Sequence, residues 1–155
     1  MPRRRSSSPA RWWITVQVRV WKIDRGAVLE QVKRWADDLL RRVADVEAVV
    51  LFGSMARGDA TAHSDVDLLI VLRQSDLPFH ERHRSIPYPP VPVPVELFPY
   101  TVAEVETMLR EGWGMAGPAA RDGLVLAERD GAWKALIDGR GLSSTIPPRG
   151  TIGKS

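Results

Sequence analysis

Hydrophobic residues recur along the chain with two different spacings, which separate predicted strands from predicted helices. Alternation over residues 14–20 predicts a half-buried strand. Residues 24–43 carry apolar side chains at helical spacing, and Asp24 stands where it caps the amino end of that helix. The apolar stripe of this helix is Val28, Val32, Trp35, Leu39 and Val43. The amino-terminal part therefore predicts a strand followed by an amphipathic helix.

Three further segments predict strands. Residues 48–52 form a short apolar run that ends at Gly53, which is typical of a buried strand, and residues 65–72 alternate. Residues 93–98 predict a third strand. Since Pro92 and Pro94 cannot donate ladder hydrogen bonds, this strand is expected at the edge of a sheet or with a late start. The polar, proline-rich residues 74–90 are expected to form a loop with at most one turn of helix.

The carboxyl-terminal half predicts shorter elements. Thr101 and Glu104 form a capping-box pattern, which predicts a helix to about residue 110. Residues 124–127 predict a short strand and residues 132–137 one or two helical turns. Residues 112–117 fit G-x-G-x-x-G as a string, but they follow a helix rather than a strand, so a helix stop and a loop are expected. The fold class predicted is α+β, with a mixed sheet of four or five strands and helices mainly on one face.

Length and composition are those of one soluble domain. The chain has 155 residues, of which 44 % are hydrophobic and 26 % are charged. We expect residues 1–11 to be a disordered basic arm, residues 12–139 the domain, and residues 140–155 a flexible tail. No run of residues is long and apolar enough to predict a membrane span. The absence of cysteine excludes disulfides and thiolate metal ligands, and it favours a cytoplasmic protein.

The net charge of +3 is unevenly distributed. Residues 12–139 hold all 19 acidic residues but only 15 of the 22 basic ones, so the predicted domain carries −4. A basic arm on an acidic body could contact nucleic acid. A solubilising, disordered tail is the favoured interpretation.

The candidate chemistry begins at Gly53 and Ser54, directly after a predicted buried strand. If a helix opens there, its first backbone N–H groups lack partners within the helix and suit a phosphate group. Glycine lets a phosphate approach closely, and Ser54 adds a hydroxyl donor. Arg57 supplies a positive charge for a triphosphate. These residues are the candidate nucleotide-binding set.

Asp65 and Asp67 follow at the start of the next predicted strand. Residues two apart in a strand point to the same face, with backbones about 6–7 Å apart, so both carboxylates could converge on one or two cations. Hard oxygen ligands select Mg²⁺ or Mn²⁺. The alternative is a plain turn followed by the solvated face of a strand. The histidines of His80-Glu81-Arg82-His83 stand one residue short of the zinc-binding spacing and are expected to lie in an exposed loop.

The order Gly53-Ser54, ten residues, Asp65-Val66-Asp67 resembles the signature of DNA polymerase β-type nucleotidyltransferases. Residues 56–58 (Ala-Arg-Gly) and Ser64 make the chain similar to the minimal nucleotidyltransferase domains of that superfamily. The resemblance implies the polymerase β-like nucleotidyltransferase fold. It also implies an enzyme that moves a nucleoside monophosphate, AMP above all, from ATP or another NTP to an acceptor hydroxyl, with Mg²⁺ or Mn²⁺ as cofactor.

The resemblance also implies roles for particular residues and a partner. The family supplies a third carboxylate, usually aspartate, and Glu96 is the match here; Asp65, Asp67 and Glu96 are therefore the expected catalytic residues and metal ligands. Minimal nucleotidyltransferases are often paired with a small helical HEPN-domain protein, as antitoxins that adenylylate a tyrosine of their toxic partner. Two alternatives stay open. One is a small-molecule nucleotidyltransferase of the aminoglycoside kind, and the other is a non-catalytic module that neutralises a partner by contact.

Overall fold

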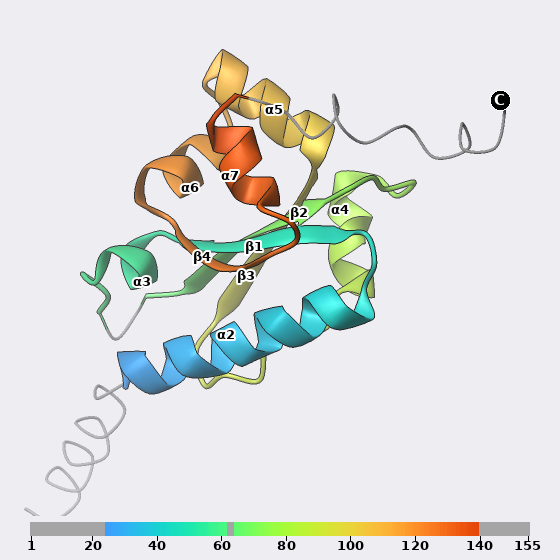
Figure 1. The fold of residues 1–155 in the computed structure, drawn as a ribbon. Helices are drawn as coiled ribbons and strands as arrows, with labels where there is room; N and C mark the ends of the chain where they lie inside the picture. The colour runs from blue at the N-terminus through green and yellow to red at the C-terminus, as the bar shows by residue number, and fades with distance from the viewer. Residues whose placement is uncertain (1–23, 62–63, 140–155) are drawn as a thin grey trace, which may run out of the picture.

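The computed structural model describes residues 24–61 and 64–139, which form a four-stranded mixed sheet between layers of helix (Figure 1). Its strands lie in the order β3-β2-β1-β4. β1 is antiparallel to β2 and to β4, whereas β2 and β3 are parallel. The elements are α2 (Arg25–Arg42), β1 (Val46–Phe52), α3 (Ser54–Arg57), β2 (Val66–Leu72), α4 (Phe79–Arg82), a 3-10 turn η1 (His83–Ser85), β3 (Val95–Thr101), α5 (Val102–Glu111), α6 (Ala116–Asp122), β4 (Leu124–Glu128) and α7 (Ala132–Ile137).

One face of the sheet is covered by α2 (Figure 1). The Asp24 side chain accepts a hydrogen bond from the Ala27 backbone N–H at 3.1 Å, as expected for the N-cap. The predicted stripe is buried from Val28 to Leu39, while Val43 follows the helix as its C-cap. On the sheet, every second residue of β2 packs against this helix: Val66, Leu68, Ile70 and Leu72. The buried stripe of the helix, with its 3.6-residue period, thus packs on the buried residues of the strand, which have a two-residue period.

The opposite face is covered by α5, α6 and α7 (Figure 1). The alternate strand residues point this way, namely Ala48, Val50, Phe52, Leu69 and Val71. The predicted α+β class and mixed sheet are confirmed, with four strands. The expected gathering of helices on one face holds for these three short helices, while the longest helix, α2, covers the other face.

Some boundaries differ from those expected. β1 begins at Val46 rather than at residue 48, and β3 runs from Val95 to Thr101, so Pro92 and Pro94 lie before the strand. β3 is at the edge of the sheet, as predicted. The loop expected at residues 112–117 is wrong in part, because helix α6 begins at Ala116. Its Gly117 and Pro118 lie in the first turn, where proline is tolerated because that turn needs no N–H donor. The strand predicted at residues 14–20 and both predicted tails lie outside the described residues.

The segment expected to be a loop, residues 74–90, contains α4 and η1 and is fastened to the sheet by Arg82. The Arg82 side chain is 8 % exposed. Its Nη1 and Nη2 atoms donate to the two carboxylate oxygens of Glu104, both at 2.8 Å, and Nη1 also donates to the Pro99 carbonyl oxygen at 3.1 Å. Glu104 completes the predicted capping box with Thr101. A single bidentate ion pair, in which the arginine is buried and the glutamate is partly exposed, thus links α4, β3 and α5.

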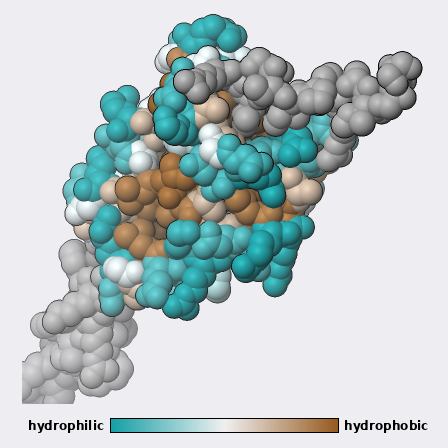
Figure 2. All heavy atoms as spheres, viewed as in Figure 1, coloured by the Kyte–Doolittle hydropathy of each residue, from teal (hydrophilic) through white to brown (hydrophobic). Residues whose placement is uncertain are grey.

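The other edge of the described sheet is β4. Hydrophobic residues gather over this strand, between α2 below and the helices α6 and α7 above (Figure 2). Leu124 and Val125 are 43 % and 42 % exposed. No helix within residues 24–61 and 64–139 combines the length and the hydropathy that crossing a bilayer would require.

Candidate active site

The turn at Gly53 lies directly against the carboxylate of Asp67. Gly53 has φ 77° and ψ −160°, a conformation essentially restricted to glycine. A Cβ atom at this position would stand 2.5 Å from Asp67 Oδ2. Sequence reasoning assigned Gly53 to close approach of a phosphate. The structure gives a second reason for glycine, which is that the turn and the carboxylate occupy adjoining space.

The helix that opens after this turn, α3, is a single turn long. A helix this short has little macrodipole, so any phosphate binding here depends on individual backbone N–H groups and on the Ser54 hydroxyl. The helix ends at Gly58, whose φ of 87° is left-handed and whose N–H donates to the Ser54 carbonyl oxygen at 3.0 Å. Ser54 is half-buried.

The first residue of α2 holds this short helix in place. Arg25 Nε and Nη2 donate to the Met55 carbonyl oxygen at 3.0 and 2.7 Å. A guanidinium group at the carboxyl end of α3 satisfies a carbonyl oxygen that the helix leaves without a partner. Sequence reasoning missed Arg25, because nothing in the local pattern links it to a segment 30 residues further on.

The three expected carboxylates meet at one end of the sheet. Asp67 is the second residue of β2, Asp65 stands just before that strand, and Glu96 is the direct neighbour of Asp67 in the parallel β2–β3 pair. Asp67 also pairs with Phe52, the last residue of β1, which places it beside the Gly53 turn. By alternation, all three side chains are on the face opposite Val66 and Leu68.

Their proximity changes the ionisation of Asp67. Burial, followed by the negative charges of Glu96 and Asp65, raises the pKa of Asp67 from 3.8 to about 6. A carboxylate whose charge is opposed by two other carboxylates is stabilised by any cation that enters between them. The arrangement is therefore electrostatically prepared for a positive charge.

The donor set fits a hard divalent cation, because all three groups supply carboxylate oxygens. Within residues 24–61 and 64–139, no three or more acidic or histidine side chains are already drawn together as a closed metal cage. To hold one cation together, the side chains of Asp65, Asp67 and Glu96 would have to move closer to one another.

Arg57 is the predicted site residue whose role in nucleotide binding the structure supports least. Its side chain is 45 % exposed and its Nε atom donates to Asp59 Oδ2 at 3.2 Å. A triphosphate would have to compete with Asp59 for this guanidinium group. The assignment of Arg57 to nucleotide binding stays a prediction.

Residues 32–104 match the family model described as a nucleotidyltransferase domain. This stretch is a nucleotidyltransferase domain. It contains the Gly53 turn and all three carboxylates. No curated protein matches the chain significantly.

Two solved structures have a similar fold. The first is a proposed nucleotidyltransferase from Sulfolobus solfataricus, with 21 % identity, coverage of 68 % of this chain and 85 % of that one, and a TM-score of 0.47. The second is a toxin–antitoxin structure with AMP-PNP, with 16 % identity, coverage of 68 % and 81 %, and a TM-score of 0.45. Both TM-scores are below 0.5, so neither likeness decides what the nucleotidyltransferase domain of this chain acts on.

Replacing Gly53 by alanine is expected to disturb both the turn and Asp67. The backbone conformation is unfavourable for alanine and the new methyl group meets the carboxylate, so unfolding free energy should fall by about 2–4 kcal/mol. Gly117→Ala is the matched control, because a Cβ at that helical position meets nothing within 4 Å. Denaturant unfolding followed by circular dichroism measures both. Equal stability of the two variants would show that the Gly53 turn is not constrained as described.

Replacing Asp67 by asparagine should stabilise the metal-free chain while removing nucleotidyl transfer. Since the pKa of Asp67 is raised in the fold, its ionisation opposes folding, with no penalty below pH 3.8 and the full penalty above about 6. Discounted for its partial exposure, the gain at pH 7.5 should be about 1 kcal/mol, or about 2–4 °C in Tm. The gain should vanish towards pH 4. Thermal melts at both pH values test this, and a lower Tm of Asp67→Asn at pH 7.5 would contradict it.

Proposed function

We propose that this nucleotidyltransferase is Mg²⁺-dependent and transfers a nucleoside monophosphate, AMP from ATP, to a hydroxyl group on a partner protein. The observation that supports this most is the meeting of Asp65, Asp67 and Glu96 beside the Gly53 turn, within the matched domain. Carboxylate ligands and a glycine turn that opens a short helix at one end of a sheet suit phosphoryl chemistry.

The donor nucleotide is proposed to bind with its terminal phosphates at Gly53 and Ser54. The glycine has no side chain to keep a phosphate away, and the Ser54 hydroxyl and the first backbone N–H groups of α3 are donors. Arg25 supports this turn from behind through the Met55 carbonyl oxygen. Bound Mg²⁺ or Mn²⁺, held by Asp65, Asp67 and Glu96, would supply neutralisation of the negative charge that phosphate and carboxylates share.

The order of the strands separates donor and acceptor. The Gly53 turn ends β1, Asp67 begins β2, and Glu96 is on β3 beyond it. The acceptor hydroxyl therefore approaches from the β3 side, where Glu96 accepts its proton. The hydroxyl oxygen bonds to the α-phosphorus, the bond from that phosphorus to the α,β-bridging oxygen breaks, and pyrophosphate leaves with that oxygen.

The partner is proposed from the motif alone. The chain resembles minimal nucleotidyltransferases, which are often paired with small helical HEPN-domain proteins, and a tyrosine hydroxyl of such a protein is the proposed acceptor. A small-molecule acceptor and a purely contact-based antitoxin are the outcomes that the following experiment distinguishes.

The test is to incubate the chain with α-labelled ATP, Mg²⁺ and a HEPN-domain protein encoded beside it. We expect the label to appear on that protein and pyrophosphate to be released. Glu96→Gln should slow transfer about 10²–10³-fold, in the range for loss of a general base, and should reduce ATP binding less than it reduces transfer, since Asp65 and Asp67 remain as metal ligands. Asp65→Asn and Asp67→Asn should abolish transfer. Asp37→Asn, on the solvent face of α2, is the control that should change nothing.

Three results would redirect the proposal. Label on an aminoglycoside without any protein would favour the small-molecule enzyme. Neutralisation of the partner by the doubly substituted Asp65→Asn, Asp67→Asn chain would favour the contact-only module. Absence of label under all conditions, with ATP binding measured calorimetrically as absent too, would end the enzymatic proposal.

A further inference from the structure

The outer edge of β3 offers backbone groups at two residues only. Val66 N–H donates to the Pro94 carbonyl oxygen at 2.9 Å. This bond fixes the parity of the parallel pair, that is, whether the even- or the odd-numbered residues of β3 direct their backbone groups to β2. Even-numbered residues of β3 therefore direct their N–H and C=O groups to β2, and odd-numbered residues direct theirs outward. The outward residues of β3 are Val95, Leu97, Pro99 and Thr101.

The second half of this edge is closed. Pro99 has no N–H to offer, and its carbonyl oxygen accepts from the buried Arg82. Thr101 N–H donates to Glu104 Oε2 at 3.1 Å. For the outward N–H and C=O groups of Val95 and Leu97, the described part of the chain supplies no hydrogen-bond partner. The open edge, defined here as Val95 to Leu97, thus flanks Glu96 on both sides and stops at Pro99.

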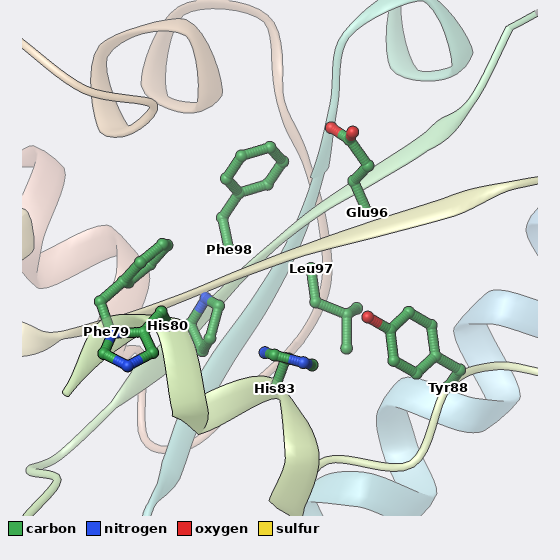
Figure 3. Close-up of a pocket in the computed structure, with 8 residues that line it drawn as sticks. Phe79, His80, His83, Tyr88, Glu96, Leu97 and Phe98 are labelled. Carbon is green, nitrogen blue, oxygen red and sulfur yellow. The ribbon is translucent and has the colours of Figure 1, made fainter. Parts of the chain in front are cut away.

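A cavity of about 300 Å³ lies along this open edge (Figure 3). Glu96 and Phe98 point to one side of β3, while Leu97, His83 and Tyr88 lie on the other side. The cavity therefore wraps around a strand edge rather than sinking into one face of the sheet. An occupant would meet backbone groups in the middle and different side chains above and below.

We propose that the acceptor docks as an extended polypeptide segment that pairs with the open edge of β3 and presents its hydroxyl side chain beside Glu96. This inference rests on the proposed function and specifies the form of its acceptor. An added strand lies about 4.7–4.9 Å from β3, and its side chains alternate between the two faces. The residue beside Glu96 points to the same face as Glu96, and its two neighbours point towards Tyr88 and His83.

The parity of β3 brings the side chain of the added strand close to Glu96. Because the backbone groups of Glu96 are used by β2, a residue opposite Glu96 in an antiparallel added strand forms a non-hydrogen-bonded pair. Such pairs have the closer side chains, with Cα atoms about 4.5 Å apart. The hydroxyl of the added strand is then delivered next to the carboxylate that accepts its proton.

The lining chemistry favours a polypeptide over a nucleic acid. The residues lining the cavity include the Glu96 carboxylate and no lysine or arginine. The charge of nearby Arg82 is paired with Glu104. A nucleic-acid acceptor would bring phosphates that need cations, whereas the two open N–H and C=O positions match the repeat of an extended peptide backbone.

Leu97→Pro tests the proposal selectively. It removes an outward N–H without removing a bond to β2, as Pro99 already does at the next outward position. The probe is acetyl-Thr-Val-X-Val-Thr-amide, with serine, threonine or tyrosine at X, and its backbone N-methylated counterpart as a matched control. Amide hydrogen exchange by NMR is expected to be fast at Val95 and Leu97 in the free chain, and slow at Glu96 and Phe98. The unmethylated peptides should slow exchange at Val95 and Leu97 about tenfold, and the methylated ones should not.

Leu97→Pro should abolish this peptide response at Val95 while Leu97→Ala retains it, and both variants should bind ATP with Mg²⁺ as the wild type does. The proposal is overturned if the Leu97 amide is protected in the free chain, if methylated peptides act equally well, or if a short RNA protects the edge and the peptides do not. Peptide protection without metal-dependent ATP uptake would leave the docking edge standing and refute the proposed function. Metal-dependent ATP uptake without peptide protection would refute the docking edge and leave the proposed function standing.

Discussion

The partial burial of Asp67 beside two other carboxylates, at one end of the sheet, is the constraint on which the rest of this structure depends. The pairing of β2 with β3 places Glu96 directly beside Asp67, and Asp65, just before β2, lies close enough to Asp67 to affect its ionisation. The hydrophobic core fixes that pairing, since a shift by one residue would turn Val66 and Leu68 out of the core. The fold therefore buries part of Asp67 and holds it near two other carboxylates, and the raised pKa of Asp67 reflects first its burial and then these two charges. A cation bound between these groups would relieve the cost of ionising Asp67 there, which would add to its binding free energy.

The remaining parts of the site follow from that end of the sheet. Gly53 is needed where β1 finishes because the Asp67 carboxylate fills the space that a side chain would take. Arg25, the first residue of α2, hydrogen-bonds the helical turn α3 that follows Gly53 and so links the longest helix to the site. On the far side, Arg82 and Glu104 fasten α4 beside β3 and close the strand edge beyond Leu97. In the proposed reaction, the donor and acceptor sides are thus built by different segments on either side of the carboxylates.

Sequence patterns predicted the elements whose periodicity is long or whose caps are explicit. The stripe of α2, the capping box at Thr101 and the alternation that puts Asp67 opposite Val66 all follow from local spacing, and the structure confirms them. Helix α6 was missed because glycine and proline in its first turn read as a loop. Arg25 and Arg82 were missed because their partners are distant in the chain, which no local pattern reveals. The assignment of Ser54 and Arg57 to a nucleotide depends on a ligand and stays a prediction.

The central claim is that one cation joins the ends of β1, β2 and β3, and paramagnetic broadening by Mn²⁺ tests it most directly. Substoichiometric Mn²⁺ added to the ¹⁵N-labelled chain should broaden the amide signals around Gly53, Asp67 and Glu96 first, while those of α7 keep their intensity. Excess Mg²⁺ should restore the broadened signals. Broadening that spreads evenly over the exposed acidic residues, or that leaves Gly53 and Glu96 unaffected, would contradict the account.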